Sequence, residues 1–218
     1  MSSAIKRVIT KTKRFTARYS RRARNVIFSA KGAALVFAVI IGVPLILGGM
    51  REAKNVYTAD LLQTIAEVES NDNYNAYFGN AKNTKVQFTA MSVGEVLNWQ
   101  QEFIEDGSPS SAVGRYQFLN TTLLGLTKEL GIDHDEQFNQ LLQDKLAVAL
   151  LERRGLNEYV DRKMTREEFA HNLSQEWAAL PKTIGSNPEK SYYDGDGLNS
   201  ARLTTSEIMA GIATVRKL

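Results

Sequence analysis

Glu69 is the residue whose surroundings most clearly suggest chemistry. Leu62, Ile65 and Ala66 mark the i, i+3, i+4 face of a helix, and Glu69 occupies the i+7 position of that face. The turn-forming run SNDNYN follows, so the carboxyl should lie inward at a helix C-terminus. Burial and the negative end of the helix dipole both raise the pKa of such a carboxyl. The alternative is an ordinary acid exposed by fraying, as we expect for Glu67.

A carboxyl with a raised pKa can donate a proton near neutral pH. Cleavage of a glycosidic bond needs such a general acid, because the departing sugar oxygen must be protonated as its bond breaks. Asp72, three residues after Glu69, is the nearest candidate for a second acid. A two-carboxylate hydrolase would need one roughly 5 to 9 Å from the first.

The segment SSAVGRYQFL, residues 110–119, is a second candidate site. Gly114 permits close backbone approach just before three polar residues, Arg115, Tyr116 and Gln117. Amide and hydroxyl groups suit sugar hydroxyls and N-acetyl groups, an aromatic ring suits the apolar face of a sugar, and a guanidinium can bind a carboxylate. The segment could therefore line a carbohydrate cleft. The alternative is a plain junction between a loop and a strand.

A third candidate segment runs from a helix that carries Trp177 into a long polar loop after Pro181. Tyr192 and Tyr193 in this loop offer surfaces on which sugars can stack. Trp177 could belong either to the core or to a cleft. We expect these aromatic residues to bind substrate.

Metal and thiol chemistry are disfavoured. The chain has no cysteine, and its two histidines, His134 and His171, lack the spacing of paired metal ligands. No GxSxG motif is present for a serine hydrolase. We expect no metal and no cofactor.

The elements that must position these residues are mainly helical. Residues 58–70 form the helix that ends at Glu69, and capping boxes predict helix starts at Ser92, Thr165 and Thr204. Further helices are expected over 121–130 and 135–154, each followed by a glycine that can close it. Only residues 86–90 and 115–119 suggest strands. The expected fold is mainly α, of the α+β kind, with a small β-hairpin region.

The N-terminal part of the chain predicts a membrane anchor. Residues 33–50 contain no charge and would span roughly 27 Å as a helix, close to the thickness of a bilayer core. Residues 1–32 form a basic arm, which should stay on the cytoplasmic side and leave residues 51–218 outside. The alternatives are a cleaved signal peptide and a buried core helix. We therefore expect a basic arm (1–32), a transmembrane anchor or signal-anchor (33–50) and one domain (51–218).

The charge distribution supports this division. Ten of the 27 Lys and Arg residues and none of the 24 Asp and Glu residues precede residue 51, so the remainder carries 17 cations against 24 acids. The basic pI near 9.0 thus reflects the arm rather than the domain. Nucleic acid is not expected as a partner, except as a minor possibility through the basic arm; the arm could also contact anionic lipid, and we favour a role as an orientation signal.

The three candidate segments, taken in order, resemble the phage lambda-type endolysins, lysozyme-like enzymes that cleave peptidoglycan as lytic transglycosylases. The likeness covers residues from about 58 to 218 and depends on the combination of ES at a helix end, GRYQFL and WAALPKTIG. By this resemblance, Glu69 matches the single catalytic acid of the family. Residues 114–117 match its cleft hairpin motif, and Trp177 with Pro181 matches the motif beside the site.

The resemblance implies a lysozyme-like fold and cleavage of the MurNAc-GlcNAc β-1,4 bond in peptidoglycan glycan strands. In that family the Glu protonates the leaving oxygen, the N-acetyl group assists, and the Glu then takes a proton from the 6-hydroxyl to give a 1,6-anhydro product. The absence of an obvious second carboxylate near GRYQFL fits this reaction. The alternatives are a hydrolytic lysozyme that uses a second acid, and a non-catalytic anchored wall-binding virion protein.

The predicted anchor departs from the lambda-type pattern, because those endolysins are soluble. In this respect the chain resembles a signal-anchored endolysin, or a virion component that opens the wall during genome entry. We expect it in the host inner membrane, held through residues 33–50 with the catalytic domain in the periplasm, or in the virion beside other virion proteins.

Overall fold

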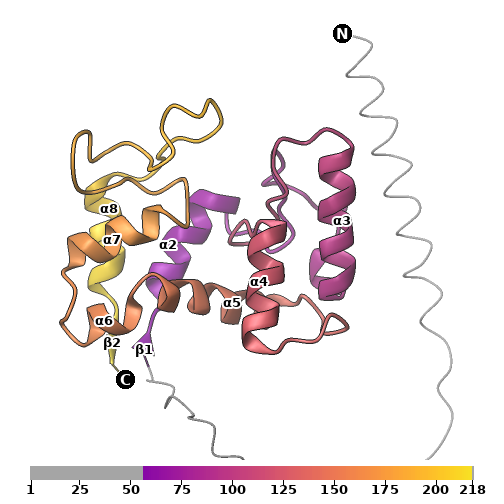
Figure 1. The fold of residues 1–218 in the computed structure, drawn as a ribbon, viewed down its shortest axis with the longest axis horizontal. Helices are drawn as coiled ribbons and strands as arrows, with labels where there is room; N and C mark the ends of the chain where they lie inside the picture. Colours follow the sequence, from indigo (N-terminus) through magenta and orange to yellow (C-terminus); the bar gives the residue numbers. More distant parts are fainter. Residues whose placement is uncertain (1–55, 218) are drawn as a thin grey trace, which may run out of the picture. The chain divides into compact units, whose positions relative to one another are not determined.

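The computed structural model describes residues 56–217, and this part of the chain is mainly helical (Figure 1). It has seven α-helices, one 3-10 helix and a two-stranded sheet. The α-helices are α2 (Ala59–Ser70), α3 (Val93–Glu105), α4 (Asn120–Leu130), α5 (Gln140–Arg153), α6 (Leu156–Val160), α7 (Arg166–Ser174) and α8 (Thr205–Ala213). The expectation of a mainly α fold is confirmed.

All three predicted capping boxes form. The side chains of Ser92, Thr165 and Thr204 each accept a hydrogen bond from the backbone N–H three residues later. The residue at that position is a glutamate, whose side chain accepts a hydrogen bond from the backbone N–H of the capping residue. Each cap satisfies backbone donors that the helix itself leaves free, a contribution of about 1 kcal/mol. Helices α3, α7 and α8 therefore begin where the sequence predicts.

Helix α5 is shorter than the predicted 135–154. It begins at Gln140 because Asn139 caps it, the Asn139 side chain accepting from the N–H of Leu142 at 2.9 Å. The preceding residues have another role. The carbonyls of His134 and Glu136 accept hydrogen bonds from the first two N–H groups of α3, each at 2.8 Å.

Helix α7 also ends early, at Ser174 instead of near residue 179. The Ser174 hydroxyl donates to the carbonyl of His171 at 2.7 Å, and turns replace the helix before Pro181. Unwinding leaves the N–H of Ala179 without a helical partner. This N–H is therefore available to the Glu69 carboxyl.

The two predicted strands are wrong. In residues 86–90 the chain forms the 3-10 helix η1 (Phe88–Ala90), because the Asn83 side chain accepts from the N–H of Val86 at 3.2 Å. In residues 115–119 Gln117 adopts a left-handed conformation with φ of 52°, and a single bridge joins Val113 to Phe118. The expected β-hairpin region is reduced to isolated bridges, since Val113 also pairs with Tyr77, which pairs in turn with Asn80.

The sheet instead joins the two ends of the described chain. Strand β1 (Val56–Tyr57) pairs antiparallel with β2 (Arg216–Lys217), Val56 opposite Lys217. Helix α2 follows β1 directly and packs on α8, which packs in turn on α7. Figure 1 shows α3 and α4 side by side, with α5 between this pair and the other helices.

The segment that carries GRYQ is fixed from within the core. Gly114 has a φ of 79°, and a Cβ added there would lie 2.5 Å from Oε1 of Gln143. That Oε1 atom accepts the Arg115 N–H at 2.9 Å, while Nε2 of Gln143 donates to the carbonyl of Tyr74 at 3.1 Å. Glycine is required here both for the left-handed backbone and for this close approach.

No helix among residues 56–217 is both long and apolar enough to cross a membrane. The predicted basic arm (1–32) and anchor (33–50) lie outside the described residues.

We predict that Gly114→Ala lowers the free energy of unfolding by roughly 2–4 kcal/mol, because it combines left-handed strain with overpacking. Gly125→Ala is the matched control. Gly125 lies inside α4 with nothing near its Cβ position, so alanine should stabilise the helix by roughly 0.5–1 kcal/mol. Urea denaturation of both variants measures the difference, and equal midpoints would contradict the assigned role of Gly114.

Candidate active site

Glu69 lies in the last turn of α2 and faces inward. Its side chain is only 9% exposed, whereas Glu67 is exposed, as the helical spacing predicts. Asn71 ends the helix in a left-handed conformation with φ of 57°. The expected place of Glu69, at a helix C-terminus beside a loop, is confirmed.

Two groups contact the Glu69 carboxyl. Oε1 accepts a hydrogen bond from the backbone N–H of Ala179 at 3.2 Å, and Oε2 lies 3.7 Å from Nη2 of Arg202. Burial raises the pKa of the Glu69 carboxyl; the positive charge of Arg202 and the Ala179 N–H act in the opposite direction. The net pKa is above the ordinary value, so the carboxyl can hold a proton at a higher pH than an exposed glutamate.

Ala179 connects the segment after α7 to the loop that carries Arg202. Its N–H donates to Glu69, and its carbonyl accepts the N–H of Arg202 at 2.8 Å. The Arg202 side chain is 55% exposed and extends toward the carboxyl from the solvent side. The backbone of Ala179 thus positions both Glu69 and Arg202.

The carboxyl opens onto a pocket of about 800 Å³, which we call the Glu69 pocket. Residues from α2, α3 and α4 line it, together with the loops 77–81, 109–112 and 176–179 and the segment 193–202. Its lining mixes aromatic with amide and hydroxyl side chains, among them Tyr77, Asn80, Ser110, Gln117, Thr121, Trp177, Tyr193, Asn199 and Ser200. Such a lining can offer both hydrogen bonds and stacking surfaces to a polar ligand.

The GRYQ residues divide between this pocket and the core. Gln117 lines the Glu69 pocket, and its Nε2 donates to the carbonyl of Gly114 at 2.9 Å. Arg115 and Tyr116 do not line it; they lie along a separate pocket of about 410 Å³ with Gln63 and Asp144. Of the three polar residues expected to contact substrate, the structure brings only Gln117 to the same pocket as Glu69.

Arg115, itself buried, is the centre of a polar cluster whose carboxylates are partly exposed. Its Nε lies 2.6 Å from the Asp72 carboxylate, its Nη2 donates to Gln63, and its guanidinium stacks 5.0 Å from the ring centroid of Tyr74. The Tyr116 hydroxyl donates to Asp144 at 2.8 Å. These bonds occupy the polar groups that a sugar would otherwise contact, so the cluster braces the end of α2.

The braced cluster is tied directly to the site. The Ser70 hydroxyl, adjacent to Glu69, donates to the carbonyl of Arg115 at 2.7 Å, and the Trp177 indole N–H donates to the carbonyl of Tyr116 at 3.2 Å. Trp177 is 3% exposed, yet it lines the Glu69 pocket. It is therefore both a core residue and part of the wall.

The predicted second acid, Asp72, lies outside the Glu69 pocket and is paired with Arg115. The second carboxyl of the pocket is Glu176, whose Oε2 lies 2.8 Å from Nε of Arg154. Its side chain is 10% exposed. The sequence analysis missed it, although Glu176 directly precedes Trp177.

The two tyrosines of the long loop differ in position. Tyr193 lines the Glu69 pocket and its hydroxyl donates to the carbonyl of Gln175 at 2.7 Å. Tyr192 is exposed, packs edge-on against Tyr193 and His171, and is not part of the lining. Arg202, which the sequence analysis also missed, follows in the same loop; a cation with no acid beside it in LNSARLT was the available signal.

A helical domain that holds two largely buried carboxyls, Glu69 and Glu176, on the wall of a polar and aromatic pocket belongs to the class of proteins suited to acid–base chemistry on a polar ligand. A family model described as Endolysin matches residues 59–196, well over half of the chain. The chain therefore belongs to the endolysin family, phage enzymes that degrade peptidoglycan. A search of curated proteins and a search of solved structures give no match.

We predict that Glu69→Gln stabilises the fold at neutral pH. The folded-state pKa of Glu69 is raised, so the folded protein loses stability as pH rises from the unfolded value of 4.5 through the folded pKa. Glutamine removes this loss, and the gain should be roughly 0.5–2 kcal/mol above the folded pKa and vanish below 4.5.

Urea denaturation across this pH range measures the effect. Glu67→Gln, on the exposed face of the same helix, is the matched control. A Glu69→Gln variant that is less stable than the wild type at neutral pH would contradict this prediction. It would show that the ionised carboxylate stabilises the folded protein through its contacts by more than burial of its charge destabilises it.

Proposed function

We propose that the chain is a lysozyme-like peptidoglycan lytic transglycosylase that cuts the MurNAc-GlcNAc β-1,4 bond with Glu69 as its single acid and base. The observation that carries this proposal is the buried carboxyl of Glu69, whose pKa is raised, on the wall of a pocket of about 800 Å³. Membership of the endolysin family supplies the substrate class, peptidoglycan, and cleavage of its glycan strands is part of the proposal.

In the proposed mechanism Glu69 protonates the glycosidic oxygen while the bond to C1 of the muramic sugar breaks and its N-acetyl oxygen bonds to C1. The Glu69 carboxylate then accepts the proton of the 6-hydroxyl, whose oxygen displaces the N-acetyl oxygen at C1. This gives a 1,6-anhydro ring and restores the protonated acid. Neither step needs a second carboxylate or an attacking water.

The other carboxyls near the site favour this single-acid reaction. Asp72 is paired with Arg115 at 2.6 Å, and Glu176 with Arg154 at 2.8 Å. Both carboxylates are thus held by arginines, and Asp72 does not line the Glu69 pocket. Arg115 and Tyr116 serve in this proposal to position the end of α2, while Gln117, Trp177 and Tyr193 contact substrate and Tyr192 extends the stacking surface at the rim.

A hydrolytic lysozyme is the second candidate, and one observation favours it. Glu176 lines the same pocket as Glu69 and could activate a water if Arg154 moved away. Asp72 would need to leave Arg115 and enter the pocket. A non-catalytic wall-binding protein is the third alternative, and it would not need a buried acid.

We further propose that residues 33–50 anchor the enzyme in the host inner membrane and place the domain in the periplasm. The uncharged run and the basic arm before it support this orientation. A periplasmic domain would meet peptidoglycan directly. A virion component that opens the wall during genome entry is the alternative location.

We predict that Glu69→Gln lowers the turnover of purified sacculi by roughly 10²–10⁴-fold, because a general acid contributes about this factor. Glu67→Gln should retain wild-type turnover. Mass spectrometry of the released muropeptides should find 1,6-anhydromuramoyl ends, one water lighter than reducing ends.

These products should persist in Glu176→Gln. Reducing muramic ends from the wild type would replace the transglycosylase proposal by the lysozyme. Sacculus binding with no released product from the wild type would favour the non-catalytic alternative.

Arg202 should set the alkaline limit of activity. Its charge lowers the pKa of Glu69, so Arg202→Gln should raise that pKa and move the alkaline limb of kcat/KM to higher pH, since the acid must be protonated to act. Arg202→Lys keeps the charge and should keep the limb near its wild-type position. An unmoved limb in Arg202→Gln would mean that Arg202 does not act on the titrating acid.

A further inference from the structure

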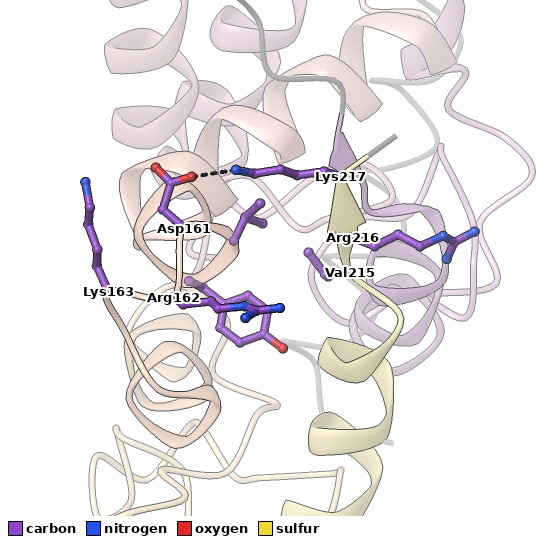
Figure 2. A pocket seen from close by; sticks show the side chains of 8 residues that line it. Asp161, Arg162, Lys163, Val215, Arg216 and Lys217 are labelled. Carbon is purple, nitrogen blue, oxygen red and sulfur yellow. Dashed lines mark ion pairs between the residues drawn. The ribbon is translucent and has the colours of Figure 1, made fainter.

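A second pocket, of about 730 Å³, lies between the turn after α6 and strand β2, and we call it the basic pocket (Figure 2). It shares no lining residue with the Glu69 pocket. Its lining consists of Tyr159, Val160, Asp161, Arg162, Lys163, Val215, Arg216 and Lys217. Four of these residues are cations and one is an acid.

The cations of the basic pocket are only partly neutralised. Lys217 pairs with Asp161 at 3.0 Å, across the two walls, and the Arg216 guanidinium stacks 4.1 Å from the ring centroid of Tyr57. Arg162 and Lys163 are exposed, and their side chains make no ion pair within residues 56–217. Figure 2 shows Arg162 extended across the pocket and Lys163 pointing outward beside it. Figure 2 also shows the Arg216 guanidinium on the far side of β2, so among the described residues the unpaired positive charge of the pocket is that of Arg162 across it and of Lys163 beside it.

The basic pocket adjoins the strand that follows the predicted membrane anchor, and this position indicates the membrane as its binding partner. Strand β2 pairs with β1, which begins at Val56. Only residues 51–55, which include Arg51 and Lys54, separate β1 from the predicted anchor. Five residues span at most roughly 18 Å, so an anchor over 33–50 keeps β1 and the adjoining basic pocket close to the bilayer surface.

We propose that the basic pocket binds the phosphates of anionic phospholipid headgroups and docks the domain on the membrane that holds its anchor. This inference rests on the proposed anchor and is independent of the chemistry at Glu69. Cations near a surface of anionic lipid are attracted to it. Peptidoglycan also carries negative charge, but the short connector favours lipid as the occupant.

The test uses the full chain in lipid nanodiscs. Because the chain has no cysteine, Glu158→Cys in α6, beside the pocket, gives a single position for a fluorescent donor. Energy transfer to an acceptor lipid then reports how near the domain lies to the bilayer. Discs of phosphatidylcholine alone are compared with discs that also contain phosphatidylglycerol.

We expect greater energy transfer in the discs with phosphatidylglycerol, and a decrease on addition of salt. Arg162→Asn with Lys163→Gln should lower the ratio of docked to undocked domain by roughly 30-fold, as two surface cations contribute. Asparagine is chosen because Arg162 has a φ of 60°, which asparagine tolerates. The matched control, Lys128→Gln with Lys145→Gln, removes the same charge from exposed positions in α4 and α5.

Equal transfer in the two kinds of disc, or equal loss in the control, would overturn the proposal. So would a double variant at Arg162 and Lys163 that binds sacculi more weakly while its energy transfer in the discs is unchanged, since the occupant would then be the wall polymer. A wild-type chain that washes off the discs would refute the anchor and this docking together. Sacculus digestion by the same preparations tests the chemistry at Glu69 separately.

Discussion

The site depends on one constraint, the burial of the Glu69 carboxyl between the end of α2 and the unwound segment after α7. Burial removes the carboxyl from water, and the Ala179 N–H at 3.2 Å is the backbone donor that compensates it. That donor is available only because α7 ends at Ser174. The end of α7 and the last turn of α2 therefore form the acid site together. The polar cluster around Arg115 holds α2 in place beside them.

Arg202 adds an adjustable element to this constraint. A fully buried acid without a cation would hold its proton firmly and could not easily return as a base. Arg202, at 3.7 Å and half exposed, favours the carboxylate without forming a tight pair.

Sequence patterns correctly predicted the features that depend on neighbouring residues, namely helix starts and the faces of a helix. The capping boxes gave the starts of α3, α7 and α8, and the helical spacing distinguished inward Glu69 from exposed Glu67. Long-range partners escaped the sequence analysis. Arg115 has the residue type of a ligand-binding group, but Asp72 and Gln63 satisfy it, and only the fold brings these residues together. Arg202 lies 133 positions after Glu69, a separation that no spacing rule covers. The strand predicted at 115–119 failed for a similar reason, because Gln143 holds this segment in a turn from another helix.

The most direct test of the account is a carbon-13 NMR titration of the Glu69 side-chain carboxyl in the intact protein, assigned by its loss in Glu69→Gln. The account predicts a Glu69 titration midpoint clearly above the ordinary glutamate value of 4.5. A Glu69 midpoint at or below 4.5 would show that the carboxyl is ionised throughout the neutral range, and would contradict its role as the proton donor.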